Sequence, residues 1–172
     1  SKVGQLESVV FQADLGNYRE KCQRVSKLAS YIAQKLGLET ANTIRAGMLC
    51  KGDLVSEMVG EFPDLQGIMG SYYARHDGEA EEVCIAIGEH YRPTQSGGVL
   101  PTSAVASCVA LADKIDSLVG IFGIKQPPTG SRDPFALRRQ ALGVVRICIE
   151  NKVDFCLDDC LAEAAGLHDK NF

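Results

Sequence analysis

Three groups of residues in this 172-residue chain have types and spacings that suit a chemical role. The first is His76 and Asp77, because an imidazole beside a carboxylate is a frequent start to a metal site. Neither His90 nor His168 lies at the i, i+4 spacing that places two imidazoles on one helix face. The pair also precedes Gly78, where a helix is expected to end. We therefore predict a solvated helix end here, with no metal.

The second group contains Asp113 and Asp116, which are three residues apart and so share one face of a helix. Two carboxylates alone make a poor cation site. We favour a structural role in which they pair with Lys114 and with a neighbouring helix, because buried carboxylates need such partners. The segment 51–53, Lys-Gly-Asp, interrupts an apolar helix. Two interpretations of it stay open, the remnant of a site that faces a cleft and a solvated notch.

The third group is basic. Residues 125–146 hold five cations and one anion, a local charge of +4 in a chain whose net charge is −4. Electrostatic binding follows local fields and not the total charge, so this excess needs a partner. The cations are Lys125, Arg132, Arg138, Arg139 and Arg146.

The loop in this basic segment is expected to be rigid. Pro127, Pro128 and Gly130 stop regular structure, and Asp133 followed by Pro134 is typical of a helix start. A loop that ends at a helix N-terminus presents guanidinium and backbone N–H groups to a phosphate. We predict RNA contacts at Lys125, Arg132, Arg138 and Arg139. The alternative, in which these arginines pair with the acidic helix at 79–89 or with the acidic tail, stays open.

A second basic surface is predicted on a helix at 17–36. Its apolar stripe includes Val25 and Ile32, and its other face carries cations with one acid, Glu20. We expect that face to be solvated and to add weaker RNA contacts. The predicted secondary contacts are Arg19, Lys21, Arg24 and Lys27.

The hydrophobic periodicity predicts an all-α fold of about six or seven packed helices in a single domain covering 1–172. Helices are expected at 17–36, 40–59, 63–76, 79–90, 103–124 and 134–150, and a short one around Leu157 and Leu161, with no convincing strand pair. From about 151 an acidic tail begins, with Asp154, Asp158, Asp159, Glu163 and Asp169. The predicted buried positions on either side of the basic loop are Ile115, Leu118, Val119, Phe122, Leu137, Ala141, Leu142, Val145 and Ile149.

Composition sets broad limits on function. With 45% hydrophobic and 23% charged residues, the composition is typical of a globular domain. The pI near 5.4 argues against nucleic-acid binding over the whole surface and allows it on one basic face. No apolar run is long enough to span a bilayer, and no membrane partner is predicted. No nucleophile with a neighbouring base appears, so no catalytic residue is predicted. We expect Cys22, Cys50, Cys84, Cys108 and Cys148 to be reduced and mostly buried, as in a cytoplasmic protein.

Four long strings give a more specific signal. They are EFPDLQGIMGSYYARHDGE (61–79), EHYRPTQSGGVLPTS (89–103), ALADKIDSLVGIFGI (110–124) and PTGSRDPFALRRQALGVVRI (128–147). In this order and spacing they resemble the beta subunit of bacterial-type glycyl-tRNA synthetase. The resemblance covers nearly the whole chain, from about Phe11 onward. Because that subunit is several times longer and Ser1 is not a natural start, we expect the chain to be a piece of it.

The resemblance implies an internal helical domain similar in fold to the HD phosphohydrolases. It also implies an assembly that joins glycine to tRNA(Gly) with ATP and Mg, in which the alpha subunit carries the adenylation site. The alpha partner would be a separate chain in a heterotetramer or a region of a fused chain. The beta subunit would hold the tRNA, and no cofactor is expected in this domain.

The HD phosphohydrolases bind metal through a His-Asp pair that follows an apolar helix, with an earlier His and a later Asp. Here the place after Met48 and Leu49 reads Cys50 and Lys51, so the pair is missing. Asp113 or Asp116 stands where the later acid belongs. The resemblance therefore implies a degenerate metal site, at which a lysine would repel a divalent cation.

The predicted function is tRNA binding and positioning by a non-catalytic domain of a glycine–tRNA ligase. Two alternatives remain. One is a metal-dependent HD phosphohydrolase acting on nucleotides, with Asp113, Asp116 or His76 as ligands. The other is a structural spacer whose arginines pair within the chain.

Overall fold

A computed structural model describes residues 2–168 of the chain, and within this range the fold is a bundle of α-helices. The predicted all-α class is confirmed. The described residues form nine helices instead of six or seven, because short turns at the start and after α3 count as helices of their own. Their bounds are α1 Lys2–Gln5, α2 Tyr18–Lys35, α3 Ala41–Leu49, α4 Glu57–Glu61, α5 Ile68–His76, α6 Glu81–Glu89, α7 Ala104–Gly123, α8 Leu137–Glu150 and α9 Leu157–Gly166.

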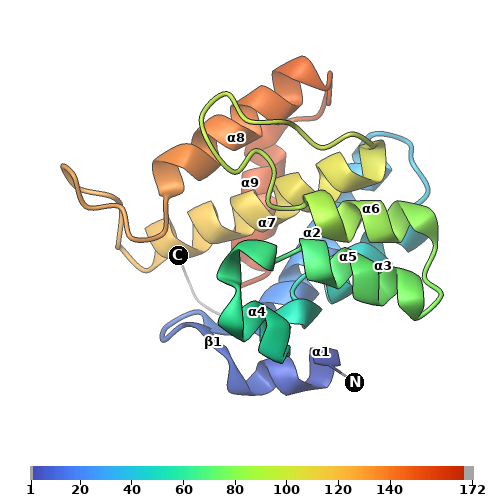
Figure 1. The fold of residues 1–172 in the computed structure, drawn as a ribbon. Coiled ribbons are helices and arrows are strands. Elements are labelled where there is room, and N and C mark those ends of the chain that lie inside the picture. Colours follow the sequence, from blue (N-terminus) through green and yellow to red (C-terminus); the bar gives the residue numbers. More distant parts are fainter. Residues whose placement is uncertain (1, 169–172) are drawn as a thin grey trace.

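The bundle is built around α7, which runs through its middle (Figure 1). Fifteen of its 20 residues are buried, so its whole circumference is in contact with protein. The helices α2, α3, α6, α8 and α9 all pack against it. Ser103 begins α7 as expected, because its hydroxyl accepts a hydrogen bond from the Ala106 N–H at 3.0 Å.

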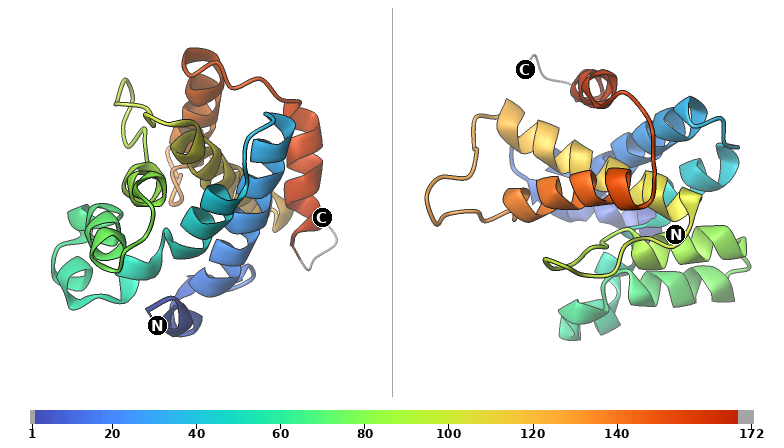
Figure 2. Two further views of the ribbon diagram at one scale, coloured as in Figure 1. Left: turned by 90° about the vertical axis from the view of Figure 1, so that its right-hand side faces the viewer. Right: turned by 90° about the horizontal axis from the view of Figure 1, so that it is seen from above.

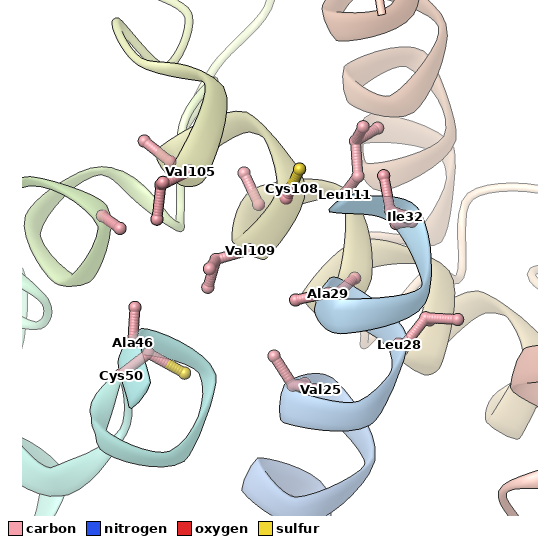
Figure 3. Packing of buried hydrophobic residues seen from close by; sticks show 14 of the residues in the cluster. Val25, Leu28, Ala29, Ile32, Ala46, Cys50, Val105, Cys108, Val109 and Leu111 are labelled. Atoms are coloured by element: carbon pink, nitrogen blue, oxygen red, sulfur yellow. The ribbon is translucent and has the colours of Figure 1, made fainter. Parts of the chain in front are cut away.

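The helix predicted at 17–36 is confirmed as α2. Asn17 and Glu20 form a capping box, in which each side chain accepts from the other residue's backbone N–H. The buried stripe of α2 packs on α7 and α3 (Figure 3). In Figure 3 Val25, Ala29 and Ile32 of α2 point toward Val109 and Leu111 of α7.

The helix predicted at 40–59 is broken into three pieces. After α3 the chain makes a 3₁₀ turn at Gly52–Val55 and then forms α4, which Ser56 caps by accepting from the Val59 N–H at 3.3 Å. Another 3₁₀ turn, at Pro63–Leu65, precedes α5. Gly47 permits a close crossing of α3 over α2, because a side chain there would meet the backbone of α2.

The prediction of no strand pair is wrong. Strands β1 (Val10–Gln12) and β2 (Gly16–Asn17) form a short antiparallel hairpin before α2. Strands of two or three residues are too short to show alternation, so hydropathy carries no signal of them. The hairpin carries Leu15 into a minor core with Ile121 and Leu137.

The buried face predicted for the last long helix is wrong at four of its five residues, and only Leu137 is buried. Helix α8 buries Leu137, Val144 and Ile147, whereas Leu142, Val145 and Ile149 are 45%, 48% and 71% exposed. Ala141 is exposed as well. This helix has two apolar stripes, and hydrophobic period alone does not say which one meets α7. At the end of α7, Ile115 is buried and Leu118 and Val119 are half-buried, but Phe122 is exposed.

The cysteine prediction is confirmed for four of its five residues. Cys22, Cys50, Cys84 and Cys108 are buried and free, and Cys148 is half-buried and free. Of the acidic tail, residues up to 168 are described and contain α9, whereas Asp169 lies outside the described residues. No helix among residues 2–168 has both the length and the apolar character needed to cross a membrane.

The crossing of α3 over α2 gives a stability prediction. A Cβ added at Gly47 would lie 2.6 Å from the Ser26 Cα, a backbone atom that cannot turn aside. We expect Gly47→Ala to lower the free energy of unfolding by about 1–3 kcal/mol in urea unfolding, despite the better helix propensity of alanine. The control is Gly60→Ala in α4, where nothing lies within 4 Å of the added Cβ. A Gly47→Ala protein as stable as Gly60→Ala would contradict this account of the crossing.

Candidate functional site

The two acids of α7 lie at the centre of a buried ion-pair cluster. The Lys51 Nζ is 2.8 Å from the Asp113 Oδ2, and the Lys21 Nζ is 3.3 Å from the Asp113 Oδ1. These side chains come from α2, from the turn after α3 and from α7. All three residues are at most 6% exposed. The predicted structural role of Asp113 is supported by these contacts.

Asp116 holds the second half of the cluster. Its carboxylate is 2.9 Å from the Lys21 Nζ, 2.7 Å from the Arg24 Nε and 3.3 Å from the His168 Nε2. Lys21 also donates to the Ser117 hydroxyl at 2.8 Å, which places it between the two acids. The partner predicted for the acids, Lys114, donates to the His90 carbonyl oxygen at 3.3 Å instead. Helical spacing alone could not identify the partners, because they come from other helices.

Electrostatics keeps these carboxylates ionised. Burial alone would raise the pKa of Asp113, but the ammonium groups of Lys51 and Lys21 outweigh it and hold the pKa well below its usual range. Burial and the contacts with Lys21, His168 and Arg24 have the same combined effect on the pKa of Asp116. Burial would lower the pKa of Lys51, yet Asp113 holds it well above its ordinary value. The Asp113 and Asp116 carboxylates are therefore charged at neutral pH, and Lys51 and Asp113 form an ion pair.

The solvated basic face predicted on α2 is wrong for Lys21 and Arg24. These residues are 2% and 8% exposed, because the first turns of α2 face the acids of α7. Of the predicted secondary contacts, Lys27 is exposed. Arg19 is partly exposed and pairs with Glu7.

A cleft of about 630 Å³ opens beside the cluster. Its basic lining residues are Lys21, Lys51, Lys114 and Arg139, and its acidic ones are Asp64 and Asp113. Phe11, Tyr18, Tyr91 and Phe135 supply aromatic walls. The hairpin, the start of α2, the middle of α7 and the start of α8 thus meet at one place.

The segment 51–53 fits the cleft interpretation and not the solvated notch. Lys51 and Asp53 are 2% and 1% exposed. Lys51 lines the cleft with its ammonium 3.8 Å above the Tyr91 ring. Asp53 is turned the other way and accepts from the Gly67 and Gly70 N–H groups at 2.7 and 2.9 Å, which caps the start of α5.

The basic loop between α7 and α8 projects from one end of the bundle (Figures 1 and 2). Its tip is a tight turn in which Thr129 and Arg132 exchange backbone hydrogen bonds. The side chains predicted to contact RNA are exposed, and within residues 2–168 no acid lies within 4.0 Å of their charged groups. They are Lys125, Arg132, Arg138 and Arg139.

The predicted alternative of internal pairing does not fit this arrangement. Glu79 and Glu81, at the acidic helix, pair with Arg45 and Arg75 instead of with the loop. Arg146 is different from the other cations of its segment, because its Nε is 2.7 Å from the Glu150 Oε1.

The start of α8 corrects part of the phosphate prediction. The helix begins at Leu137 and not at Pro134. Asp133 does cap it, but through a carboxylate that accepts from the Leu137 and Arg138 N–H groups at 2.7 and 3.1 Å. These N–H groups are therefore already occupied. The loop offers guanidinium groups to an anion, without these two backbone donors.

His76 and Asp77 lie at the end of α5 as expected, with side chains 88% and 75% exposed. Their Nδ1 and Oδ1 atoms are 3.3 Å apart. Within residues 2–168 no three His, Cys, Asp or Glu side chains gather closely enough to hold a metal ion. Cys50, next to Lys51 in the chain, is buried and packs against Cys22.

A family model described as the glycyl-tRNA synthetase beta subunit matches residues 1–171. The chain belongs to this family. The glycine–tRNA ligase beta subunit of Shewanella piezotolerans is 52% identical over 171 residues, which are 99% of this chain and 25% of that protein. The beta subunit of Pseudomonas syringae pv. tomato is 58% identical over 153 residues, which are 89% of this chain and 22% of that protein. The chain spans about a quarter of the length of these curated relatives, and the resemblance seen in the four strings is confirmed.

The buried pairs of Asp116 give a stability prediction. Its removal leaves Lys21 and Arg24 buried without that carboxylate, so we expect Asp116→Ala to cost about 3–5 kcal/mol in urea unfolding. The control is Glu81→Ala, which removes one partner of the exposed pair with Arg75 and should leave the free energy of unfolding almost unchanged. Equal losses in the two variants would show that the buried pairs do not hold the bundle together.

A second prediction concerns the stability of the fold at low pH. Burial lowers the pKa of His90 to about 3. The folded state therefore keeps this imidazole neutral, and its contribution to stability is complete above the unfolded pKa near 6.5 and is lost as pH falls from there toward 3. Between pH 7 and pH 5 we expect His90 to account for a loss of about 2 kcal/mol in the free energy of unfolding. The loss should be smaller by that amount in His90→Gln, and an identical loss in both proteins would refute it.

Proposed function

We propose that this domain binds and positions tRNA(Gly) for a cytoplasmic glycine–tRNA ligase. In this proposal an alpha subunit, or an alpha region of a fused chain, forms the adenylate from glycine, ATP and Mg. The beta-subunit domain takes no part in that chemistry and holds the RNA. The observation that supports it best is the exposed basic loop, whose cations have no acidic partner among the described residues of an acidic chain.

The loop suits a phosphate backbone for a simple physical reason. Lys125 precedes the tight turn, Arg132 closes it, and Arg138 and Arg139 lie in the first turn of α8. Guanidinium groups bind phosphate through a planar fork of donors, and such contacts position RNA without reading its sequence. Arg19 and Lys27 would add weaker contacts from α2. Lys21 and Arg24 are not part of this exposed surface, because they are buried.

The proposal of a non-catalytic domain rests on Lys51. We infer a bundle like that of the HD phosphohydrolases in which Cys50 and Lys51 replace the metal-binding His-Asp pair. The Lys51 ammonium lies 2.8 Å from an Asp113 oxygen, so that carboxylate already has a cation of its own. A divalent ion bound there would have to displace a buried lysine and then lie beside its charge. The nucleotide phosphohydrolase is therefore the weaker candidate.

The structural spacer remains a second candidate, supported by one observation. The outer stripe of α8, Leu142, Val145 and Ile149, is apolar and exposed. A stripe of that kind suits contact with another part of the longer beta subunit. The two roles are compatible, since α8 carries arginines at its start and the apolar stripe along its length.

The test removes charge from the loop and leaves the cleft intact. In the full synthetase, Arg132→Ala with Arg138→Ala should weaken tRNA(Gly) binding and lower the slope of log Kd against log salt by about 2, one for each phosphate that is no longer neutralised. Aminoacylation should fall with the affinity. The measurements are filter binding across a salt series and initial rates at limiting tRNA.

The matched control removes two arginines elsewhere. Arg45 and Arg75 are about half exposed and already paired with Glu79 and Glu81, so Arg45→Ala with Arg75→Ala should leave the salt slope unchanged. If the loop variant has the affinity, salt slope and aminoacylation rate of this control, the basic loop does not bind tRNA.

A further inference from the structure

We propose that the cleft beside the ion-pair cluster binds a single nucleotide, with its phosphate among the buried lysines and its base against the aromatic wall. This site shares Arg139 with the exposed loop surface, but its existence does not require that the loop bind tRNA. The argument rests on the charge of the lining, the position of Lys114 and the aromatic side chains.

The lining of the cleft carries more positive charge than the protein itself neutralises. Its basic residues, Lys21, Lys51, Lys114 and Arg139, face only two acids, Asp64 and Asp113. Asp113 is shared between Lys21 and Lys51. The carboxylate of Asp116 lies behind Lys21 and is matched by Arg24. An excess of two positive charges therefore faces the cleft.

Lys114 is the clearest part of that excess. It is 4% exposed, and the hydrogen bond described for its ammonium is the one to the His90 carbonyl oxygen at 3.3 Å. Burial lowers its pKa to about 8, so it is still mostly protonated at neutral pH. A buried ammonium without a carboxylate is costly. A bound anion would offset that cost by supplying the missing charge and acceptors.

The size and walls of the cleft indicate what the anion is part of. A volume of about 630 Å³ lies within the range of small-molecule sites and exceeds what a lone phosphate fills. Tyr18 and Phe135 line it and are half-buried, so part of each ring is available to a ligand. Aromatic faces stack on nucleobases of any sequence, and Arg139 at the wall can reach a phosphate or stack on a base. A nucleoside phosphate matches this lining, because its phosphate can meet the basic side chains and its base can stack on the aromatic ones.

The nucleotide can come from two sources, a free mononucleotide or a nucleotide unit of bound RNA. The chemistry recognised is the same, and the test separates them. Adenosine monophosphate, adenosine and inorganic phosphate are titrated separately into the 172-residue chain by calorimetry. We expect adenosine monophosphate to bind at least about tenfold more tightly than adenosine alone or inorganic phosphate alone. Intact tRNA is then added to the monophosphate complex: displacement assigns the site to a nucleotide of RNA, and simultaneous binding assigns it to a free nucleotide.

Lys114→Met is the decisive variant. It keeps an unbranched side chain that is one heavy atom shorter, breaks no ion pair with an acid and removes the ammonium charge that has no carboxylate partner. We expect a higher midpoint of urea unfolding and at least a tenfold weaker binding of adenosine monophosphate. A structural lysine would give the opposite result, namely a loss of stability with unchanged binding, and that outcome would overturn the proposal.

Two neighbouring arginines give a pair of variants with little risk to the fold. Arg139 lines the cleft and Arg138 does not, and both are exposed at the start of α8. Arg139→Ala should weaken the monophosphate several-fold, whereas Arg138→Ala should leave it unchanged. No measurable binding of the monophosphate, binding no tighter than that of phosphate, or equal effects of the two substitutions would each refute the site. None of these outcomes decides whether the loop binds tRNA, because that test uses Arg132 and Arg138.

Discussion

Two carboxylates buried on α7 determine how the rest of the bundle is oriented. Carboxylates in a protein interior must meet cations, and here the cations come from elements far away in the sequence. Asp116 fixes the rotation of α2 through Lys21 and Arg24, while Asp113 holds the turn after α3 through Lys51. Once α2 is rotated in this way its apolar stripe faces α7, and the hairpin that precedes α2 is carried to the wall of the cleft. One set of charge pairs thus sets both the packing and the shape of the candidate site.

The sequence was sufficient where the signal is local. The positions of α2 and α7 follow from hydrophobic period and from caps at Asn17 and Ser103, and these interactions act within one turn of helix. The sequence was insufficient where one helix has two apolar stripes and either could be the buried one. Helix α8 has two apolar stripes, and only the position of α7 decides that Val144 and Ile147 are inside and Val145 is outside. The hairpin was missed because its strands are shorter than one period of alternation.

The candidate site shows the same limit. Sequence indicated that Asp113 and Asp116 are paired structural acids, but the nearest cation along the chain, Lys114, is not the partner. The partners are more than 60 residues away, at Lys51 and Lys21, and nothing in the spacing of charges reveals such pairs. For the same reason the cations of α2 looked solvated: on a helical wheel Lys21 and Arg24 belong to the polar side, and burial by charge pairing leaves no trace in hydropathy.

The two concentrations of positive charge differ in physical kind, and this difference bears on what each can recognise. The arginines of the loop stand in water, so their attraction for phosphate is long-ranged, screened by salt and indifferent to the rest of the ligand. In the cleft, Asp113 holds Lys21 and Lys51 in place, and the Tyr91 ring also contacts Lys51. An anion must shed its water to reach these lysines. That cost is recovered only by a ligand that also fills the aromatic wall. Charge in the loop therefore favours capture of any polyanion, whereas charge in the cleft favours a ligand of one shape.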